Sequence, residues 1–471
     1  MSETHREILR LALPSVAANI TVPLLGLVDT TIVGHLGRAE YIAAIAVGTT
    51  IFNMSYWLLA FLRMGTTGLV AQAVGQFRSR EGQSGKALLS APLQTPHSIL
   101  CHALLLALAL SLLLLLARSP ILRLSLWLMP AEAETARFVA QYFHICIWGA
   151  PAMLSLFVLN GWFIGCQDTR SPMWVAIGQN VLNIMLSLWL VFGLGWKIEG
   201  VAVGTLAAQW CALGLALMLA WRKGEAWRKS DRELRAAQRP PCAVSRSASP
   251  LHRLHSLFAA FPSRFFRVNR DIFLRTLCLV AVTVCFTSAG TRLGGTTLAA
   301  NALLMQLFIL YSYFTDGLAN AAEALSGKYA GARNHEMLRH TVRCLFVQGA
   351  VISTVFTLLY LCGGQAILHL LTDQGPVIAL ATAYLPWTVA IPIIALQAMV
   401  WDGVFIGLTW TRQMLLSMFA AACVFFALSQ AMPHLMPANH ALWLAFDAYL
   451  LTRGAVQTFF VRRANHHLTK Y

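Results

Sequence analysis

One carboxylate, that of Asp29, interrupts the apolar stretch VPLLGLVDTTIVGHLG between Val22 and Gly37. An ionised side chain in a membrane-spanning helix costs about 3 kcal/mol on insertion scales, so it usually faces a wet cavity or a partner. There it can exchange a proton or help to hold a cation. The alternative is that Asp29 reaches the outer interface or caps a neighbouring backbone. About five residues, or roughly 8 Å, separate it from the end of its helix, which predicts a site in the outer half of the membrane.

A set of polar side chains on two consecutive apolar segments could line a cavity beside such a site. They are Gln179, Asn183 and Ser187 in one segment and Thr205 and Gln209 in the next. Within each segment the residues recur every fourth position and therefore share one helical face. Asn160, in the segment before these two, is a weaker candidate. Polar stripes in lipid also hold helices together through hydrogen bonds, and the sequence leaves both roles open.

Charged residues inside other apolar segments are candidates for gating. Asp316, Asn320 and Glu323 share one helical face, and Asp402 lies in a later segment as a further intramembrane acid. Arg63 lies about as deep in its own segment as Asp316 does, nearer the cytoplasm, so no pair between Arg63 and Asp29 is expected. We expect Arg63 and the acidic face to form a cytoplasmic lock. Arg63 and Glu323 could instead extend to the cytoplasmic interface.

The composition shows which elements must position these residues. Of the 471 residues 58% are hydrophobic and only 11% charged, and the apolar runs are too long for a water-soluble core. Because a helix needs about 20 apolar residues to cross the hydrocarbon, the sequence predicts an all-α membrane protein with twelve transmembrane helices. The predicted spans are 8–34, 41–75, 88–117, 137–165, 173–195, 199–221, 272–291, 297–330, 342–366, 378–407, 413–433 and 439–461.

The basic residues predict the orientation of these spans. Lys and Arg gather at both termini and in the even-numbered connections, above all between Arg222 and Arg270. The positive-inside rule therefore places both termini in the cytoplasm. The net charge of +16 is spread over loop ends and is not gathered on one folded module, so anionic lipid explains it better than a nucleic-acid partner does.

Neither a metal site nor a cofactor site is predicted. The ten cysteines lie mostly within apolar segments, where they act as packing residues. His335, Glu336 and His340 form HExxxH, which is one residue too long to place both imidazoles on a zinc ion. Neither a GxSxG nor a Walker A sequence occurs. An enzyme is therefore not expected.

The chain contains an internal repeat. LNGWFIGCQDTR, from Leu159 to Arg170, recurs as WDGVFIGLTWTR, from Trp401 to Arg412, and AQAVGQFR at 71–78 weakly matches GKYAGARN at 327–334. The predicted organisation is an N-terminal lobe at 1–221, a basic cytoplasmic loop at 222–270 and a C-terminal lobe at 271–471. Because six crossings are an even number, the lobes keep one orientation and are related by a pseudo-two-fold axis along the membrane normal, as in many transporters.

Several stretches resemble one transporter family. They are RLALPSVAANITVPLLGLVDTTIVGHLG, the VNRDIFLR segment, the two FIG repeats and the glycine-rich ends of the second and eighth spans. Over almost the whole chain they resemble the DinF branch of the multidrug and toxic compound extrusion (MATE) family. The resemblance implies a cation-coupled exporter with two lobes of six helices that works by alternating access.

The resemblance also implies roles for individual residues. Asp29 corresponds to the proton-linked aspartate of the family's first helix, and Asn183 and Thr205 to positions that hydrogen-bond the coupling ion and substrate. Ser187 departs from the pattern, because many members have a second aspartate there. Pro14 matches a first-helix proline and Pro23 adds a second break, so this helix is expected either to move or to be statically kinked.

We therefore expect a proton-coupled antiporter that exports amphipathic, often cationic compounds across the bacterial inner membrane as a monomer. A sodium-coupled exporter is an alternative, but the serine at 187 removes a carboxylate that a hard cation would use. A flippase for lipid-linked precursors is another, although the few internal Lys and Arg residues argue against its basic cavity. No cofactor other than the coupling ion is expected.

Overall fold

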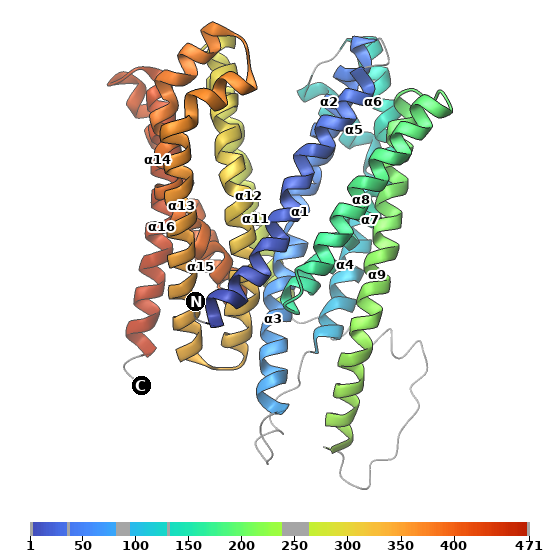
Figure 1. Cartoon of the computed structure of the whole chain (residues 1–471), viewed down its shortest axis with the longest axis vertical. Helices are drawn as coiled ribbons and strands as arrows, with labels where there is room; N and C mark the ends of the chain where they lie inside the picture. The colour runs from blue at the N-terminus through green and yellow to red at the C-terminus, as the bar shows by residue number, and fades with distance from the viewer. Residues whose placement is uncertain (1–2, 35–37, 82–94, 130–131, 238–262, 469–471) are drawn as a thin grey trace. The chain divides into compact units, whose positions relative to one another are not determined.

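The computed structural model describes residues 3–34, 38–81, 95–129, 132–237 and 263–468. Within these ranges the regular elements are helices, and no strand occurs (Figure 1). This is what the apolar composition requires, because a helix satisfies its backbone hydrogen bonds internally and lipid offers no partners for them. The chain forms two compact units, Ala17–Arg267 and Val268–Tyr471, the second of which also includes Met1–Val16.

The N-terminal unit is built around one central helix, α7, which packs against α3, α4 and α9. Its helices are the second part of α1 (Glu3–Gly34), then α2 (Ala39–Leu59), α3 (Phe61–Glu81), α4 (Pro96–Leu116), α5 (Arg118–Leu128), α6 (Ala133–Cys146), η2 (Ile147–Gly149), α7 (Ala150–Gly165), α8 (Arg170–Leu188), the π-turn η3 (Trp189–Gly193) and α9 (Ile198–Ala237).

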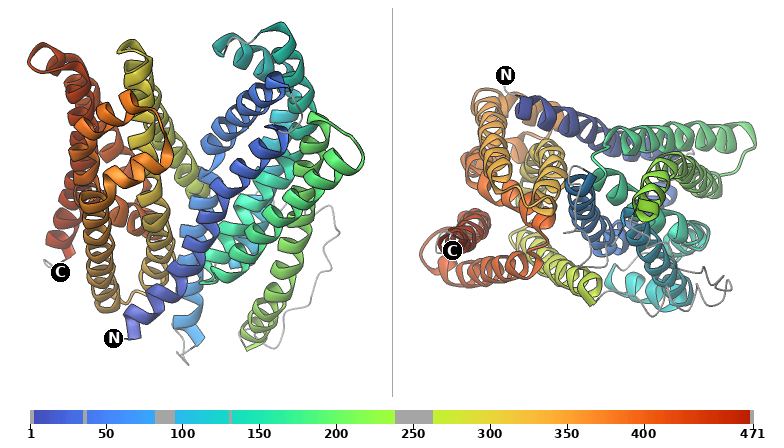
Figure 2. Two further views of the ribbon diagram at one scale, coloured as in Figure 1. Left: turned by 45° about the horizontal axis from the view of Figure 1, so that its top comes forward. Right: turned by 90° about the horizontal axis from the view of Figure 1, so that it is seen from below.

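The C-terminal unit has an equivalent central helix, α14, which packs against α12, α13 and α16 (Figures 1 and 2). Its helices are α11 (Ser263–Arg292) from Val268 on, α12 (Gly295–Gly331), α13 (His335–Leu371), α14 (Gly375–Leu408), α15 (Thr411–Ala431), η4 (Met432–His434) and α16 (Ala438–Leu468). The spans that contain α7 and α14 are each 67% buried, more than the other spans among the described residues.

Ten spans in the described part of the chain are long and apolar enough to cross a membrane, and α1 and α16 are two further long helices. The predicted spans fall on these helices with shifted ends, and the predicted span 41–75 covers both α2 and α3. Residues 88–94 of the predicted third span lie outside the described residues. Helix α9 continues to Ala237 into the predicted loop, because KGEAWRKSDRELRAA consists mostly of good helix formers. Helix α5 lies in a predicted connection and was missed, since its 11 residues are too few to span the hydrocarbon. Residues 238–262 lie outside the described residues.

Helix α1 contributes to both units. Before Ala17 it packs within the C-terminal unit, where Glu7 accepts hydrogen bonds from Lys328 Nζ at 2.8 Å and from the Tyr329 hydroxyl at 3.2 Å. Gly317 of α12 lets the helices approach, because a Cβ there would lie 2.3 Å from Val16 Cγ2. The first residues of the chain therefore pack with the C-terminal unit.

The sequence repeat corresponds to one helix crossing that both units share. A Cβ at Gly161 would lie 2.3 Å from the Arg63 carbonyl oxygen, and a Cβ at Gly403 would lie 2.6 Å from that of Ala319. Gly161 and Gly403 match in the FIG repeat, and Arg63 and Ala319 match when the 71–78 and 327–334 segments are aligned. The same glycine therefore brings the central helix onto the same turn of its neighbour in each unit.

Removing this close approach is expected to destabilise the N-terminal unit. Gly161→Ala places its methyl group against a backbone carbonyl that cannot rotate away, so α7 and α3 must separate, and the free energy of unfolding should fall by about 1–3 kcal/mol. Gly214→Ala is the matched control, because no atom lies within 4 Å of its added Cβ. Thermal unfolding of the purified protein in detergent measures both. Equal unfolding temperatures for the two variants would contradict the close packing.

Candidate functional site

Asp29 lies on α1 in the interior of the N-terminal unit. Its side chain is 8% exposed, and its Oδ1 atom accepts no hydrogen bond from the residues that the structure describes. The carboxyl group lies near α6, within electrostatic reach of Tyr142 and Cys146. Cys146 in turn contacts the Ala202 carbonyl of α9 at 3.7 Å. Asp29 is therefore buried near α6, and α6 contacts α9 through Cys146.

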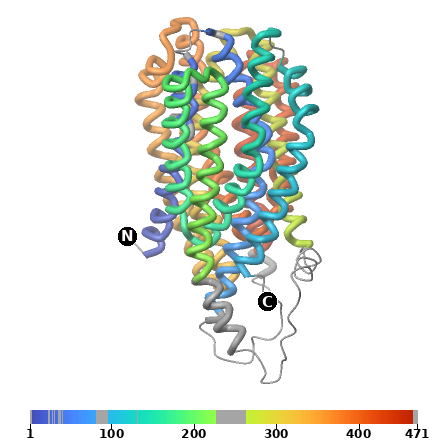
Figure 3. Tube along the Cα trace, turned by 90° about the vertical axis from the view of Figure 1, so that its right-hand side faces the viewer, coloured from blue at the N-terminus to red at the C-terminus, as the bar shows by residue number. Residues whose placement is uncertain are grey.

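Asn183, Ser187 and Thr205 form a hydrogen-bonded cluster between α8 and α9, which run side by side (Figure 3). Asn183 Nδ2 donates to Thr205 Oγ1 at 3.3 Å, and the Ser187 hydroxyl donates to Asn183 Oδ1 at 3.0 Å. The Thr205 hydroxyl donates to the Val201 carbonyl at 2.9 Å. Gly204 makes room for the cluster, because a Cβ there would lie 2.6 Å from Ser187 Oγ.

The other predicted cavity residues take different positions. Gln179 is half-buried, with its amide nitrogen 3.9 Å from Met153 Sδ. Gln209 Oε1 and Asn160 Oδ1 are both buried and accept no hydrogen bond from the described residues. Gln209 lies over Gly149, where an added Cβ would overlap it. The structure therefore joins only three of the predicted polar residues into one cluster.

The predicted gating residues differ in burial. On α1, Pro14 is half-buried and Pro23 is exposed, and the helix continues through both. Arg63 on α3 is half-buried, Asp316 on α12 is exposed and Glu323 is buried. Arg63 belongs to the N-terminal unit and the two acids to the C-terminal unit. The cytoplasmic lock between them stays a prediction.

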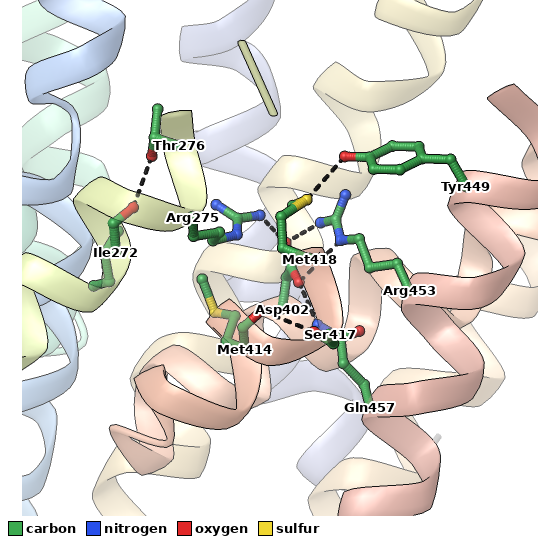
Figure 4. A network of polar contacts seen from close by, with 10 residues as sticks. All are labelled: Ile272, Arg275, Thr276, Asp402, Met414, Ser417, Met418, Tyr449, Arg453 and Gln457. Carbon is green, nitrogen blue, oxygen red and sulfur yellow. Dashed lines mark hydrogen bonds and ion pairs between the residues drawn. The ribbon is translucent and has the colours of Figure 1, made fainter. Parts of the chain in front are cut away.

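Asp402 is the centre of a buried charge network in the C-terminal unit (Figure 4). Arg275 of α11 and Arg453 of α16 both form ion pairs with it, and Arg453 binds through Nε and Nη2. Gln457 Nε2 donates to its Oδ1 at 2.6 Å. The three charged side chains are 10% exposed or less. Four donors surround one carboxylate, so the network holds α11, α14 and α16 together through an ionised Asp402.

Three buried charged residues of the C-terminal unit were not predicted from the sequence. Arg275 and Arg453 interrupt apolar runs and could have been found by the criterion that identified Asp29. The same criterion identifies Asp447, inside LWLAFDAYLL on α16. Asp447 is 4% exposed, and neither of its carboxylate oxygens has a hydrogen-bond partner among the described residues.

Asp168 anchors the turn between α7 and α8. Its Oδ1 accepts from the Arg170 and Ser171 backbone amides, both at 3.1 Å, and Lys223 of α9 forms an ion pair with its other oxygen. Burial disfavours the ionised carboxyl, but the bonds from Lys223 and Ser171 outweigh it and hold the pKa of Asp168 below its ordinary value. This turn therefore ties the start of α8 to α9.

These features coincide with one family of membrane proteins. The sequence profile of the MatE family matches residues 14–189 and 272–430, one segment in each half of the chain. The chain belongs to the MATE family. The MATE match includes Asp29, the repeated FIG motifs and Asp402 within its two segments.

Curated relatives agree with the MATE assignment and with the resemblance to the DinF branch. The chain is 36% identical over 454 residues to DNA damage-inducible protein F of Escherichia coli (strain K12), covering 96% of this chain and 91% of that protein. It is 23% identical over 359 residues to the probable multidrug resistance protein NorM of Thermotoga maritima, covering 75% of this chain and 68% of that protein.

Solved MATE structures confirm the predicted fold class. An outward-facing multidrug resistance MATE family transporter matches with a TM-score of 0.78 at 19% identity, over 100% of this chain and 98% of that one. A MATE protein in the bent conformation matches with a TM-score of 0.81 at 18% identity, over 100% and 97%. The protein is thus a multi-pass membrane protein with the twelve-helix, two-lobed MATE fold.

Proposed function

We propose that this protein is a proton-coupled antiporter that exports amphipathic, often cationic organic compounds across the bacterial inner membrane. The observation that carries the proposal is the setting of Asp29. Among the described residues of the N-terminal unit it is the buried carboxylate, and one of its oxygens has no hydrogen-bond donor. A carboxyl group of this kind is ready to bind a proton or a cationic partner.

Export of the substrate is coupled to entry of a proton because Asp29 cannot carry a proton and balance a cationic substrate at the same time. An ionised Asp29 balances the positive charge of a bound substrate, whereas a protonated Asp29 does not. Proton uptake from the outside then weakens substrate binding in an outward-open state, and release of the proton to the inside restores the site. A ligand can shift the equilibrium between the outward-open and inward-open states only if it binds the two with different affinity. The proton and the substrate must therefore each bind one state better than the other.

The Asn183, Ser187 and Thr205 cluster supports a role in sensing that exchange. Its three side chains use one another and the Val201 carbonyl as partners. Helix α6, near which Asp29 lies, contacts α9 through Cys146 at Ala202, one turn before Thr205. A change of charge on Asp29 can therefore alter the packing of α6 on α9 and the hydrogen bonds at Thr205. The substrate would then sense the charge of Asp29 through the uncharged side chains of Asn183, Ser187 and Thr205.

Proton coupling is favoured over sodium coupling by the ligands that this unit offers. A hard cation requires several oxygen ligands and charge compensation. Asp29 supplies one carboxylate, and Ser187, at the position where the resemblance indicates a second one in many relatives, supplies a neutral hydroxyl that bonds to Asn183. A single proton on Asp29 needs no further carboxylate.

A gradient experiment distinguishes the two coupling ions. Proteoliposomes reconstituted with the purified protein should accumulate a fluorescent lipophilic cation such as ethidium under an imposed pH gradient in sodium-free buffer. We expect Ser187→Asp to add a dependence of this uptake on sodium, and Ser187→Asn, which is uncharged, to add none. Wild-type uptake that requires a sodium gradient and ignores the pH gradient would refute proton coupling.

A further inference from the structure

Asp447 is a buried acid that the proposed exchange at Asp29 does not use. It lies on α16, where its neighbours in the core include Trp443, Phe446 and Leu450. Its side chain is 96% buried, and both carboxylate oxygens are shielded without a hydrogen-bond partner among the described residues. The interior of the unit therefore provides neither solvent nor a donor for a negative charge at this position.

The charged groups of the elements packed against α16 are used elsewhere. Helix α16 packs on α14, α15 and η4. It also contacts α11 through Phe286 and α12 through Asn301 and Phe308. In α14, α15, η4 and the part of α16 before Arg462, the nitrogen and carboxylate groups other than Asp447 are Asp402, Arg412, His434, His440 and Arg453. On α11, Arg275 binds Asp402 and Arg292 is exposed. On α12, the contacts with α16 are at Asn301 and Phe308, and the charged residues come later, from Asp316 on. Asp402 and Arg453 bind each other, His440 accepts from Trp387, and Arg412 and His434 are exposed. Arg453 follows Asp447 by six residues and so lies on a different face of α16.

The two buried aspartates of this unit thus have opposite surroundings. Asp402 receives bonds from two arginines and an amide, which stabilise its ionised form. Asp447 has none of these partners, and an unpaired charge in an apolar interior is very unfavourable. Surroundings that differ in this way favour the ionised form of one acid and the protonated form of the other.

We propose that Asp447 is a second proton-binding group, which carries a proton in this conformation and releases it when the C-terminal unit rearranges. Asp402 stays ionised as the anchor of three helices. The step is a proton transfer: the O–H bond of the Asp447 carboxylic acid breaks, the proton passes to water, and the electron pair stays on the carboxylate. This inference rests on the proposed proton coupling and assigns it a second site in the C-terminal unit.

Infrared spectroscopy tests the proton on Asp447 independently of transport. A protonated carboxylic acid without a hydrogen-bond partner gives a carbonyl absorption that ionised carboxylates lack. We expect this absorption to lose one component in Asp447→Asn and to shift in Asp447→Glu, whereas Asp373→Asn, at an exposed acid, leaves that component in place. Because asparagine has the shape of the neutral acid, Asp447→Asn should also fold. An unchanged absorption, or a loss of folding in Asp447→Asn alone, would overturn the proposal.

Proton counting tests its role in coupling. Each proton released on substrate binding adds about a tenfold change in substrate Kd per pH unit. We expect the pH slope for ethidium binding to fall by one proton in Asp447→Asn and to keep its wild-type value in Asp373→Asn, an exposed acid between α13 and α14. An unchanged slope in Asp447→Asn would overturn the second site. If the wild type shows no slope while the infrared component is present, the coupling proposal fails and the proton on Asp447 stands.

Discussion

Asp29→Asn is expected to reduce uptake driven by a pH gradient to the level of protein-free liposomes. The amide keeps the size of the carboxyl group but can neither bind nor release a proton, so the exchange of occupancies is lost. Substrate binding by the wild type should strengthen as pH rises, because Asp29 loses its proton and becomes able to balance a cationic ligand. In Asp29→Asn, substrate binding should release one proton fewer, so the change in substrate Kd per pH unit should be about tenfold smaller.

The folded state should survive this change. Asp29 Oδ1 has no hydrogen-bond donor among the described residues, so replacing the carboxyl group breaks no bond at that atom. Thermal unfolding in detergent is expected to match the wild type. Asp373→Asn serves as the control for loss of a carboxylate as such, and it should transport normally. Wild-type rates of pH-driven uptake by Asp29→Asn would falsify the assignment of Asp29.

Asp402→Ala is expected to be the most destabilising single substitution in the C-terminal unit. It leaves Arg275 and Arg453 buried without the carboxylate that they share. Breaking a buried ion pair from one side typically costs about 3–5 kcal/mol, because the remaining charge is uncompensated. The free energy of unfolding should fall by that amount, and the yield of folded protein in the membrane should fall with it.

A compensated variant separates the charge effect from loss of packing. Replacing the whole network by apolar residues, as in Asp402→Leu with Arg275→Met and Arg453→Met, removes every buried charge at once, and such replacements are often neutral. This triple variant should be more stable than Asp402→Ala alone when both are unfolded thermally in detergent. A triple variant less stable than the single one would show that the network acts through specific hydrogen bonds.

The candidate site could be predicted only in part from the sequence. Asp29 was found because a carboxylate in an apolar run is unusual by itself and needs no knowledge of its neighbours. The fourfold spacing of Gln179, Asn183 and Ser187 predicted one helical face, but the tertiary structure joins only the last two to Thr205. Spacing fixes the side from which a residue projects. It does not fix which neighbouring helix that side meets.

The charge network of the C-terminal unit shows the same limit. Asp402 lies 127 residues from Arg275 and 51 from Arg453. Each was visible as a charge in an apolar segment, yet nothing local indicates that the three meet. The pairing exists because α14 is the central helix of its unit and packs against α16. Asp447, only six residues before Arg453, faces another direction and has no such partner.

The sequence by itself determined the membrane-spanning class, the internal repeat and the position of Asp29. These follow from local hydropathy and from matching residues, which do not depend on how helices pack. The tertiary structure alone decided that Met1–Val16 packs with the C-terminal unit, that Gly161 and Gly403 serve one repeated crossing, and that Asp402 is paired where Asp447 is not. Those outcomes depend on how whole helices rotate and pack against one another. Residues far apart in the sequence determine this packing together.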